Sequence, residues 1–165
     1  MLHSTQRWPH DGFGVDDAKR YLDAVTPEEL ALIDQAAKVI ETCPDEFGSA
    51  FYTTLFELSP DTRALFPADL TAQKGKVVDE LAFLIEAARD LDTFVERAKG
   101  LGRRHVEYGV QHDDYRVVGV ALTAALRECM QVEWTTAHEG AWNKLYRLIA
   151  DVMRDGANET LFVES

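Results

Sequence analysis

His105 is the side chain of this sequence with the clearest potential for chemistry. It follows an apolar stripe of Phe94, Ala98 and Leu101 at intervals of four, three and four residues, which places all four positions on one helix face. An imidazole in this position can ligate a metal through one ring nitrogen. The alternative is a helix-end histidine that meets only backbone carbonyls. The residues that would surround His105 therefore decide how it is interpreted.

Three polar side chains are candidates for the same site. Tyr52 lies in an apolar helical segment, where a buried hydroxyl needs a partner. Gln73 and Val77 are four residues apart and share a helix face, although another register would bring Lys76 or Val77 closest to the site. Tyr115 follows His105 by ten positions. For Gln73, the plain alternative is a glutamine in contact with solvent.

The bulk composition excludes several classes of function. The chain has 165 residues, 46% hydrophobic and 28% charged, and is expected to form one domain. A net charge of −12 argues against a nucleic-acid partner and weakens attraction to anionic membranes. The longest apolar run, residues 117–126, is about half of what spans a bilayer, so no membrane insertion is expected.

The expected compartment is the cytoplasm. The first dozen residues contain no secretory signal, and the only cysteines, Cys43 and Cys129, are too few for a disulfide framework. A carboxylate di-metal bundle is disfavoured because the sequence has no Glu-x-x-His pair. The local cluster at residues 112–114 is interpreted as a solvated helix cap.

The hydrophobic periodicity is helical from Thr26 onward, and residues 1–25 differ from the rest. They are expected to form an N-terminal extension, partly ordered, with two or three helical turns within residues 15–25. The predicted helices begin at the Thr26 capping box, Pro44, Pro60, Asp69, Asp92, Asp113 or Asp114, and before Trp142. Gly109 is expected to break the helix of His105, and Gly156 to fray or end the last helix.

These elements predict an all-α fold of about seven uneven helices in residues 26–165. Matched lengths would favour a four-helix bundle, whereas uneven helices that cross at steep angles favour the globin arrangement, which leaves a slot for a planar cofactor.

From about Thr26 to Glu159 the sequence resembles the globin domain of bacterial flavohaemoglobins and the related single-domain bacterial haemoglobins. The motifs that carry this resemblance are Phe51-Tyr52-x-x-x-Phe56, Ser59-Pro60, Leu65-Phe66, Leu101-Gly-Arg-Arg-His105, Tyr115-Arg-Val-Val-Gly119 and Ala141-Trp142-x-x-x-Tyr146. The sequence departs from the family in three respects. The connection from Phe66 to Gln73 is short, Val77 stands where leucine is common, and residues 1–25 have no counterpart.

The resemblance implies haem b as the cofactor, with His105 as the iron ligand. It also implies that the haem contacts a set of further residues: Phe66, Gln73, Val77, Leu81 and Tyr115.

On the side of the haem opposite His105, Tyr52 and Gln73 would donate hydrogen bonds to a polar diatomic ligand. Behind His105, Tyr115 and Glu159 would form a network that strengthens the imidazole as a donor. The alternative for Glu159 is an exposed glutamate near the chain end.

The implied ligands are dioxygen, nitric oxide and carbon monoxide. The implied functions are oxygen binding and transport, or nitric oxide dioxygenation. The second needs an external flavin reductase, because no flavin or nicotinamide domain is expected before Ser165. An alternative is a haem-based sensor or adaptor in which residues 1–25 couple ligand binding to a partner. A regulator with the same fold but without haem is a further class. The resemblance fits a monomer or a homodimer.

Overall fold

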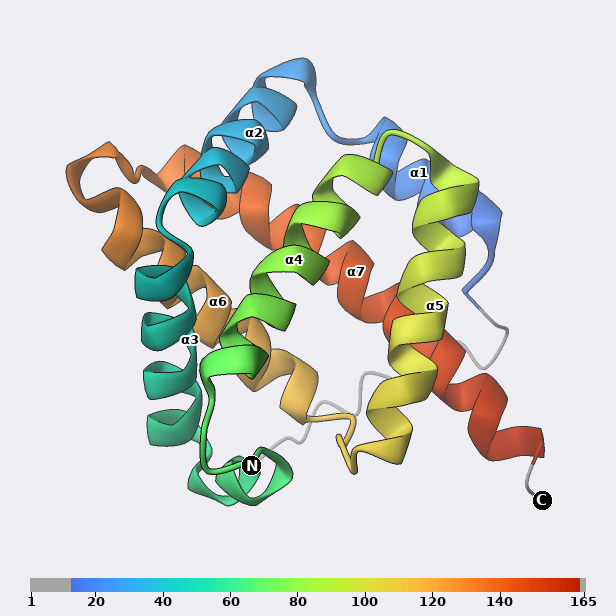
Figure 1. The fold of residues 1–165 in the computed structure, drawn as a ribbon. Coiled ribbons are helices and arrows are strands. Elements are labelled where there is room, and N and C mark those ends of the chain that lie inside the picture. The colour runs from blue at the N-terminus through green and yellow to red at the C-terminus, as the bar shows by residue number, and fades with distance from the viewer. Residues whose placement is uncertain (1–12, 164–165) are drawn as a thin grey trace, which may run out of the picture.

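The computed structural model describes residues 13–163, and these residues form helices without a strand (Figure 1). The α-helices are α1 (Val15–Asp23), α2 (Pro27–Thr42), α3 (Pro44–Leu58), α4 (Thr71–Ala87), α5 (Leu91–Glu107), α6 (Asp114–Met130) and α7 (Thr136–Val163). Two short 3₁₀ helices, η1 (Pro60–Leu65) and η2 (Gln131–Glu133), complete the fold. The all-α prediction is confirmed. The part of the predicted extension before residue 13 lies outside the described residues.

The start of α2 follows from its first four residues. The Thr26 hydroxyl accepts a hydrogen bond from the backbone N–H of Glu29 at 3.1 Å, and the Glu29 carboxylate accepts one from the N–H of Thr26 at 3.0 Å. Pro27 occupies the first helical position, where its missing N–H costs nothing. The predicted capping box is therefore confirmed.

Three predicted helix boundaries are wrong. The α4 helix begins at Thr71, and its N-cap is Leu70 and not the predicted Asp69. Asp90, and not Asp92, caps α5, because its carboxylate accepts the N–H of Thr93. Gly156 does not end α7, which continues to Val163. The backbone of α5 passes so close to Gly156 that this position has no room for a side chain. The glycine is thus a contact point inside a helix.

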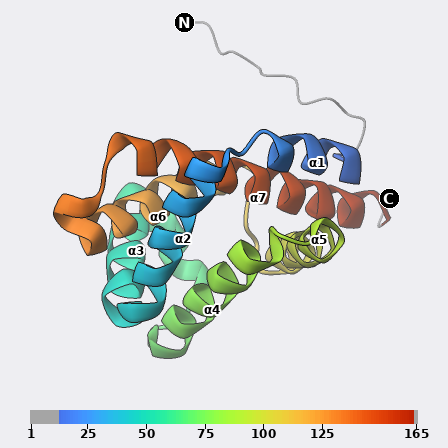
Figure 2. The ribbon, with the colours of Figure 1, turned by 90° about the horizontal axis from the view of Figure 1, so that it is seen from above.

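The helices form two crossing layers. Figure 2 shows α1 and α7 on one side of the molecule, with α4 and α5 on the other. The α3 helix packs on α6, and α5 packs on the C-terminal half of α7. A short turn at residues 88–90 joins α4 to α5, and the two helices diverge from there (Figure 1). The largest fully buried side chains of the core include Phe47, Leu55, Phe94, Leu126 and Trp142.

Within α1, Ala18 is fully buried, and the hydroxyl of Tyr21 donates to Asp151 of α7 at 3.4 Å. The short helix is therefore packed on the rest of the fold, although the division into an extension and a domain at Thr26 stays a prediction. No helix between residues 13 and 163 is long and apolar enough to cross a membrane.

Candidate functional site

His105 lies in the last turn of α5 and is half-buried. Its Nδ1 lies 2.7 Å from the carbonyl oxygen of Leu101. Since a carbonyl can only accept, Nδ1 carries the proton and Nε2 keeps its lone pair. Burial lowers the pKa of His105, while the Leu101 carbonyl acts in the opposite direction. The imidazole is therefore neutral at physiological pH, with Nε2 in the state that a metal ion requires.

The α5 helix ends just after His105 because of the backbone conformation at Gly109. Gly109 adopts a φ of +84°, a left-handed conformation that glycine reaches without steric cost. The chain reverses there, and the N–H of Val110 donates to the carbonyl of His105 at 3.0 Å. The predicted break at Gly109 is confirmed.

Tyr52 occupies the middle of α3 and is 2% exposed. Its hydroxyl is buried and has no hydrogen-bond partner among the residues that the structure describes. Burial raises the pKa of the phenol to about 12, and the neighbouring Gln73 amide partly offsets this rise. Tyr52 is thus a neutral hydroxyl in an apolar setting, with Gln73 close by but outside hydrogen-bonding geometry.

Aromatic rings surround the Tyr52 phenol. The ring of Phe66 lies 5.3 Å from that of Tyr52, edge to face, and the ring of Phe56 lies 5.7 Å from both. Arg63 fixes the loop that carries Phe66, because its guanidinium donates to the carbonyls of residues 66, 67 and 68 and stacks over Phe56. Phe66, predicted to contact the cofactor, is held in a defined place at the edge of this cluster.

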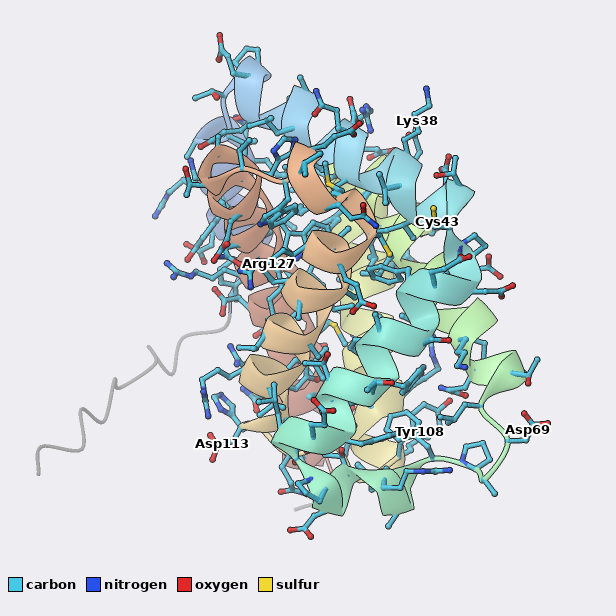
Figure 3. All side chains as sticks on the ribbon, turned by 90° about the vertical axis from the view of Figure 1, so that its left-hand side faces the viewer. Lys38, Cys43, Asp69, Tyr108, Asp113 and Arg127 are labelled. Atoms are coloured by element: carbon cyan, nitrogen blue, oxygen red, sulfur yellow. The ribbon has the colours of Figure 1, made fainter. Side chains whose placement is uncertain are left out.

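On α4, Gln73, Val77 and Leu81 follow one another at four-residue intervals and share a face. Leu81 is buried and the other two are half-buried, whereas Lys76 is exposed. This burial pattern disfavours Lys76 as the residue closest to the site, and it leaves Gln73 and Val77 as the two candidates. Figure 3 shows Asp69, just before α4, and Tyr108, just after α5, at the same end of the molecule.

Tyr115 and Glu159 are not brought together. Tyr115 is buried at the start of α6, under the guanidinium of Arg154, and its backbone oxygen accepts a hydrogen bond from Tyr146. Glu159 instead pairs with Lys99 at 2.7 Å and with Arg103 at 2.6 Å. These two cations hold the pKa of Glu159 below its usual range. The network expected behind His105 is therefore not assembled, and the partner of its Nδ1 is the Leu101 carbonyl.

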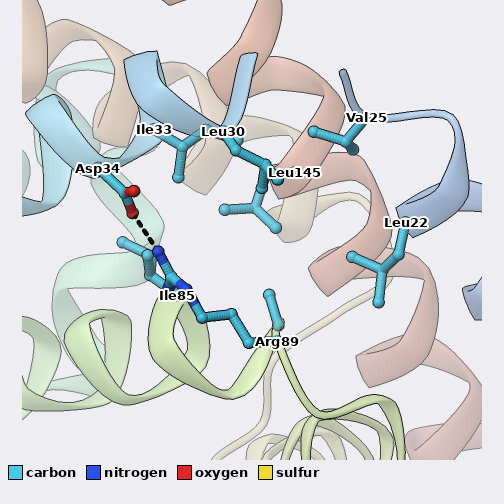
Figure 4. Close-up of a pocket in the computed structure, with 9 residues that line it drawn as sticks. Leu22, Val25, Leu30, Ile33, Asp34, Ile85, Arg89 and Leu145 are labelled. Atoms are coloured by element: carbon cyan, nitrogen blue, oxygen red, sulfur yellow. Dashed lines mark hydrogen bonds and ion pairs between the residues drawn. The ribbon is translucent and has the colours of Figure 1, made fainter. Parts of the chain in front are cut away.

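A small cavity elsewhere in the fold does not belong to this set. It has a volume of about 20 Å³ and lies between α2, the C-terminal end of α4 and α7, beside the Asp34–Arg89 ion pair of 2.7 Å (Figure 4). None of the predicted site residues lines it. In the described part of the chain, no group of three or more His, Cys, Asp or Glu side chains is arranged to hold a metal ion. His105 is therefore not part of such a group.

Comparison with known proteins supports the same fold. The globin family profile matches residues 49–153, so the chain belongs to the globin family. The sequence is 25% identical to Flavohemoprotein B of Dictyostelium discoideum over 142 residues, which cover 86% of this chain and 33% of that protein. It is 28% identical to the flavohemoprotein of Bordetella pertussis over 133 residues, which cover 78% of this chain and 33% of that protein. The chain thus spans about a third of the length of these curated relatives.

Among solved structures, the fold matches the crystal structure of a hexacoordinated heme protein from an anhydrobiotic tardigrade at pH 4. The TM-score is 0.74 at 17% identity, and the match covers 85% of this chain and 98% of the other. The predicted globin fold is therefore confirmed.

Proposed function

We propose that this globin binds haem b through Nε2 of His105 and takes up dioxygen, nitric oxide and carbon monoxide. The observation that carries the proposal is the buried hydroxyl of Tyr52, which lacks a partner in the described residues. A buried donor without an acceptor costs about 1–3 kcal/mol. A polar diatomic ligand would supply the missing acceptor.

The side chains present fit a haem. His105 offers a neutral nitrogen with its lone pair free, and Phe66, Val77 and Leu81 offer apolar surface. When bound, haem supplies a redox-active iron with a coordination position for a gas. Tyr52 would then donate to the bound gas, and Gln73 would donate to the gas or to the Tyr52 oxygen. Tyr115 would contact the cofactor from the start of α6.

We further propose that the uptake of dioxygen serves either oxygen binding or nitric oxide dioxygenation. The overall conversion joins nitric oxide, dioxygen and one electron into nitrate. A flavin reductase would supply the electron, which agrees with the similarity of this chain to flavohemoproteins. A cytoplasmic location would suit such a partner.

Haem titration of the purified protein tests the proposal. The unmodified protein is expected to give the absorption spectrum of a histidine-ligated ferrous carbon monoxide complex. His105→Ala should lose that spectrum and regain it when imidazole is added. His112→Ala, which changes an exposed histidine seven residues later, is the matched control and should behave like the unmodified protein. A histidine-type spectrum in His105→Ala without imidazole would overturn the assignment.

A sensor function has a specific observation in its favour. The backbone N–H of Phe13 donates to Asp155 of α7 at 3.1 Å, and the same carboxylate pairs with Lys99 of α5 at 2.8 Å. The segment before α1 is thus linked by one residue to the helix of His105. A sensor predicts that carbon monoxide changes amide hydrogen exchange in residues 13–23, whereas a carrier or dioxygenase predicts no change there.

A further inference from the structure

The crossing of α5 and α7 brings two backbones into direct contact. A Cβ atom built on Gly102 would lie 1.9 Å from the carbonyl oxygen of Met153, and one built on Gly156 would lie 2.3 Å from the carbonyl oxygen of Lys99. Backbone atoms cannot rotate away as a flexible side chain can. Both glycines are therefore required for the two helices to approach this closely.

A ladder of ion pairs spans the same crossing. Lys99 pairs with Asp155 at 2.8 Å and with Glu159 at 2.7 Å, and Arg103 pairs with Glu159 at 2.6 Å. The two cations are one helical turn apart on α5, and the two carboxylates are one turn apart on α7. The side chains of Lys99 and Asp155 are only 21% and 11% exposed, so solvent screens this pair less than a surface pair.

This ladder ends close to His105. Arg103 stands two residues before it, and the chain leaves the helix at Tyr108. The imidazole is bonded to the Leu101 carbonyl of its own helix, so its place in the molecule is set by the place of α5. The contacts that fix the last turns of α5 on α7 therefore also fix the imidazole.

We propose that Asp155 and Glu159 are positioning residues that place His105 by holding α5 on α7, and not by a hydrogen bond to the imidazole. This inference rests on the proposed function for its effect on haem. It gives Glu159 a role in the site, although its carboxylate is bonded to Lys99 and Arg103.

Amide hydrogen exchange of the haem-free protein tests the holding step by itself. The double variant Asp155→Asn/Glu159→Gln removes both charges and keeps the size of each side chain. It should raise the exchange rates of residues 103–107 by about tenfold, because local opening becomes easier. Glu139→Gln is the matched control, since Glu139 of α7 pairs with Arg127 at 2.9 Å and is 40% exposed, against 44% for Glu159. It should leave residues 103–107 unchanged.

Resonance Raman spectroscopy of the ferrous, haem-loaded protein tests the positioning step. The iron–imidazole stretching band should shift or broaden in the double variant, stay unchanged in Glu139→Gln, and recover in part in Asp155→Asn/Glu159→Asp, in which the carboxylate at 159 is kept.

Unchanged exchange rates in residues 103–107 of the double variant would show that Asp155 and Glu159 do not hold α5 on α7, whether or not haem binds. Faster exchange with an unchanged stretching band would overturn the positioning role and leave haem binding in place. If the unmodified protein forms no histidine–haem complex, the proposed function and the positioning of haem both fail, and the exchange data still report whether the two carboxylates hold α5.

Discussion

The surroundings of His105 and those of Tyr52 differ in how closely the helices approach and in whether the polar groups are paired. On the His105 side, α5 contacts α7 backbone to backbone, and the charged side chains across the crossing are paired. On the Tyr52 side, α3 meets α4 where a Cβ on Gly48 would lie 2.9 Å from Cβ of the Lys74 side chain, and a buried hydroxyl has no partner in the described residues.

The difference indicates which half of the site can respond to a ligand. A helix held by backbone contact has little freedom to move, so under the proposed function His105 would offer a fixed attachment point for haem. The unsatisfied hydroxyl of Tyr52, beside the half-buried Gln73, would form a stabilising hydrogen bond with a ligand that brings an acceptor. We therefore expect residues of α5 to determine haem attachment, and residues of α3 and α4 to determine the discrimination among diatomic gases.

The largest effect is expected from Gly102→Ala. The added methyl group would overlap the Met153 carbonyl oxygen, so α5 and α7 must separate, at a cost of about 3 kcal/mol or more in the free energy of unfolding. Gly140→Ala in the same α7 helix is the control, because nothing beyond its chain neighbours and its own helix backbone lies within 4 Å of its Cβ position. It should stabilise the protein by about 0.5–1 kcal/mol. Urea denaturation measures both, and a Gly102→Ala variant as stable as the unmodified protein would refute the rigid crossing.

Tyr52→Phe should act in opposite directions on stability and on gas binding. Removing the unsatisfied hydroxyl should stabilise the haem-free protein by about 1 kcal/mol. With haem bound, the same change should speed dioxygen dissociation about ten- to a hundredfold and carbon monoxide dissociation much less, because dioxygen is the more polar ligand. Denaturation and stopped-flow measurements on one pair of proteins check both effects. Equal changes for the two gases would show that the hydroxyl does not reach the ligand.

Gln73→Leu should have a smaller effect on dioxygen dissociation than Tyr52→Phe. Gln73 is half-buried and only approaches the phenol, so its amide is solvated in part and contributes less to the ligand. The exposed neighbour Lys76 provides the control, and Lys76→Met should leave both gases unaffected. A larger effect from Lys76→Met than from Gln73→Leu would show that the other helix register is correct in solution.

The sequence allowed the helices and the face that carries His105 to be predicted, because both depend on local spacing. The capping box at Thr26 and the break at Gly109 were predictable for the same reason, since each is a contact within a few residues. The role of Gly156 was not predictable. A glycine near a chain end usually weakens a helix, and only the approach of Lys99 from a helix more than fifty residues away explains it.

The partners of Glu159 show the same limit within the site. Position in the family pattern suggested Tyr115, but Lys99 and Arg103 are spaced one turn apart on α5 and face Glu159 across the crossing. The spacing of these two cations could be read from the sequence, but the identity of the helix that faces them could not. Long-range pairing depends on how helices cross, which local spacing does not determine.

The smallest expected effect is the loss of stability when Glu159 is protonated in acid. Lys99 and Arg103 hold the pKa of Glu159 below its ordinary value, so the unfolded chain takes up a proton at this position before the folded protein does. Its contribution to stability is therefore present above about pH 4.5 and is lost as the pH falls through the lower, folded-state pKa. The side chain is 44% exposed, so the contribution should stay below about 1 kcal/mol. Urea denaturation of the unmodified protein and of Glu159→Gln should show a difference at pH 7 that disappears in acid. A difference that persists unchanged to pH 3 would mean that the Glu159 side chain acts through packing, and that its ion pairs with Lys99 and Arg103 contribute nothing measurable to stability.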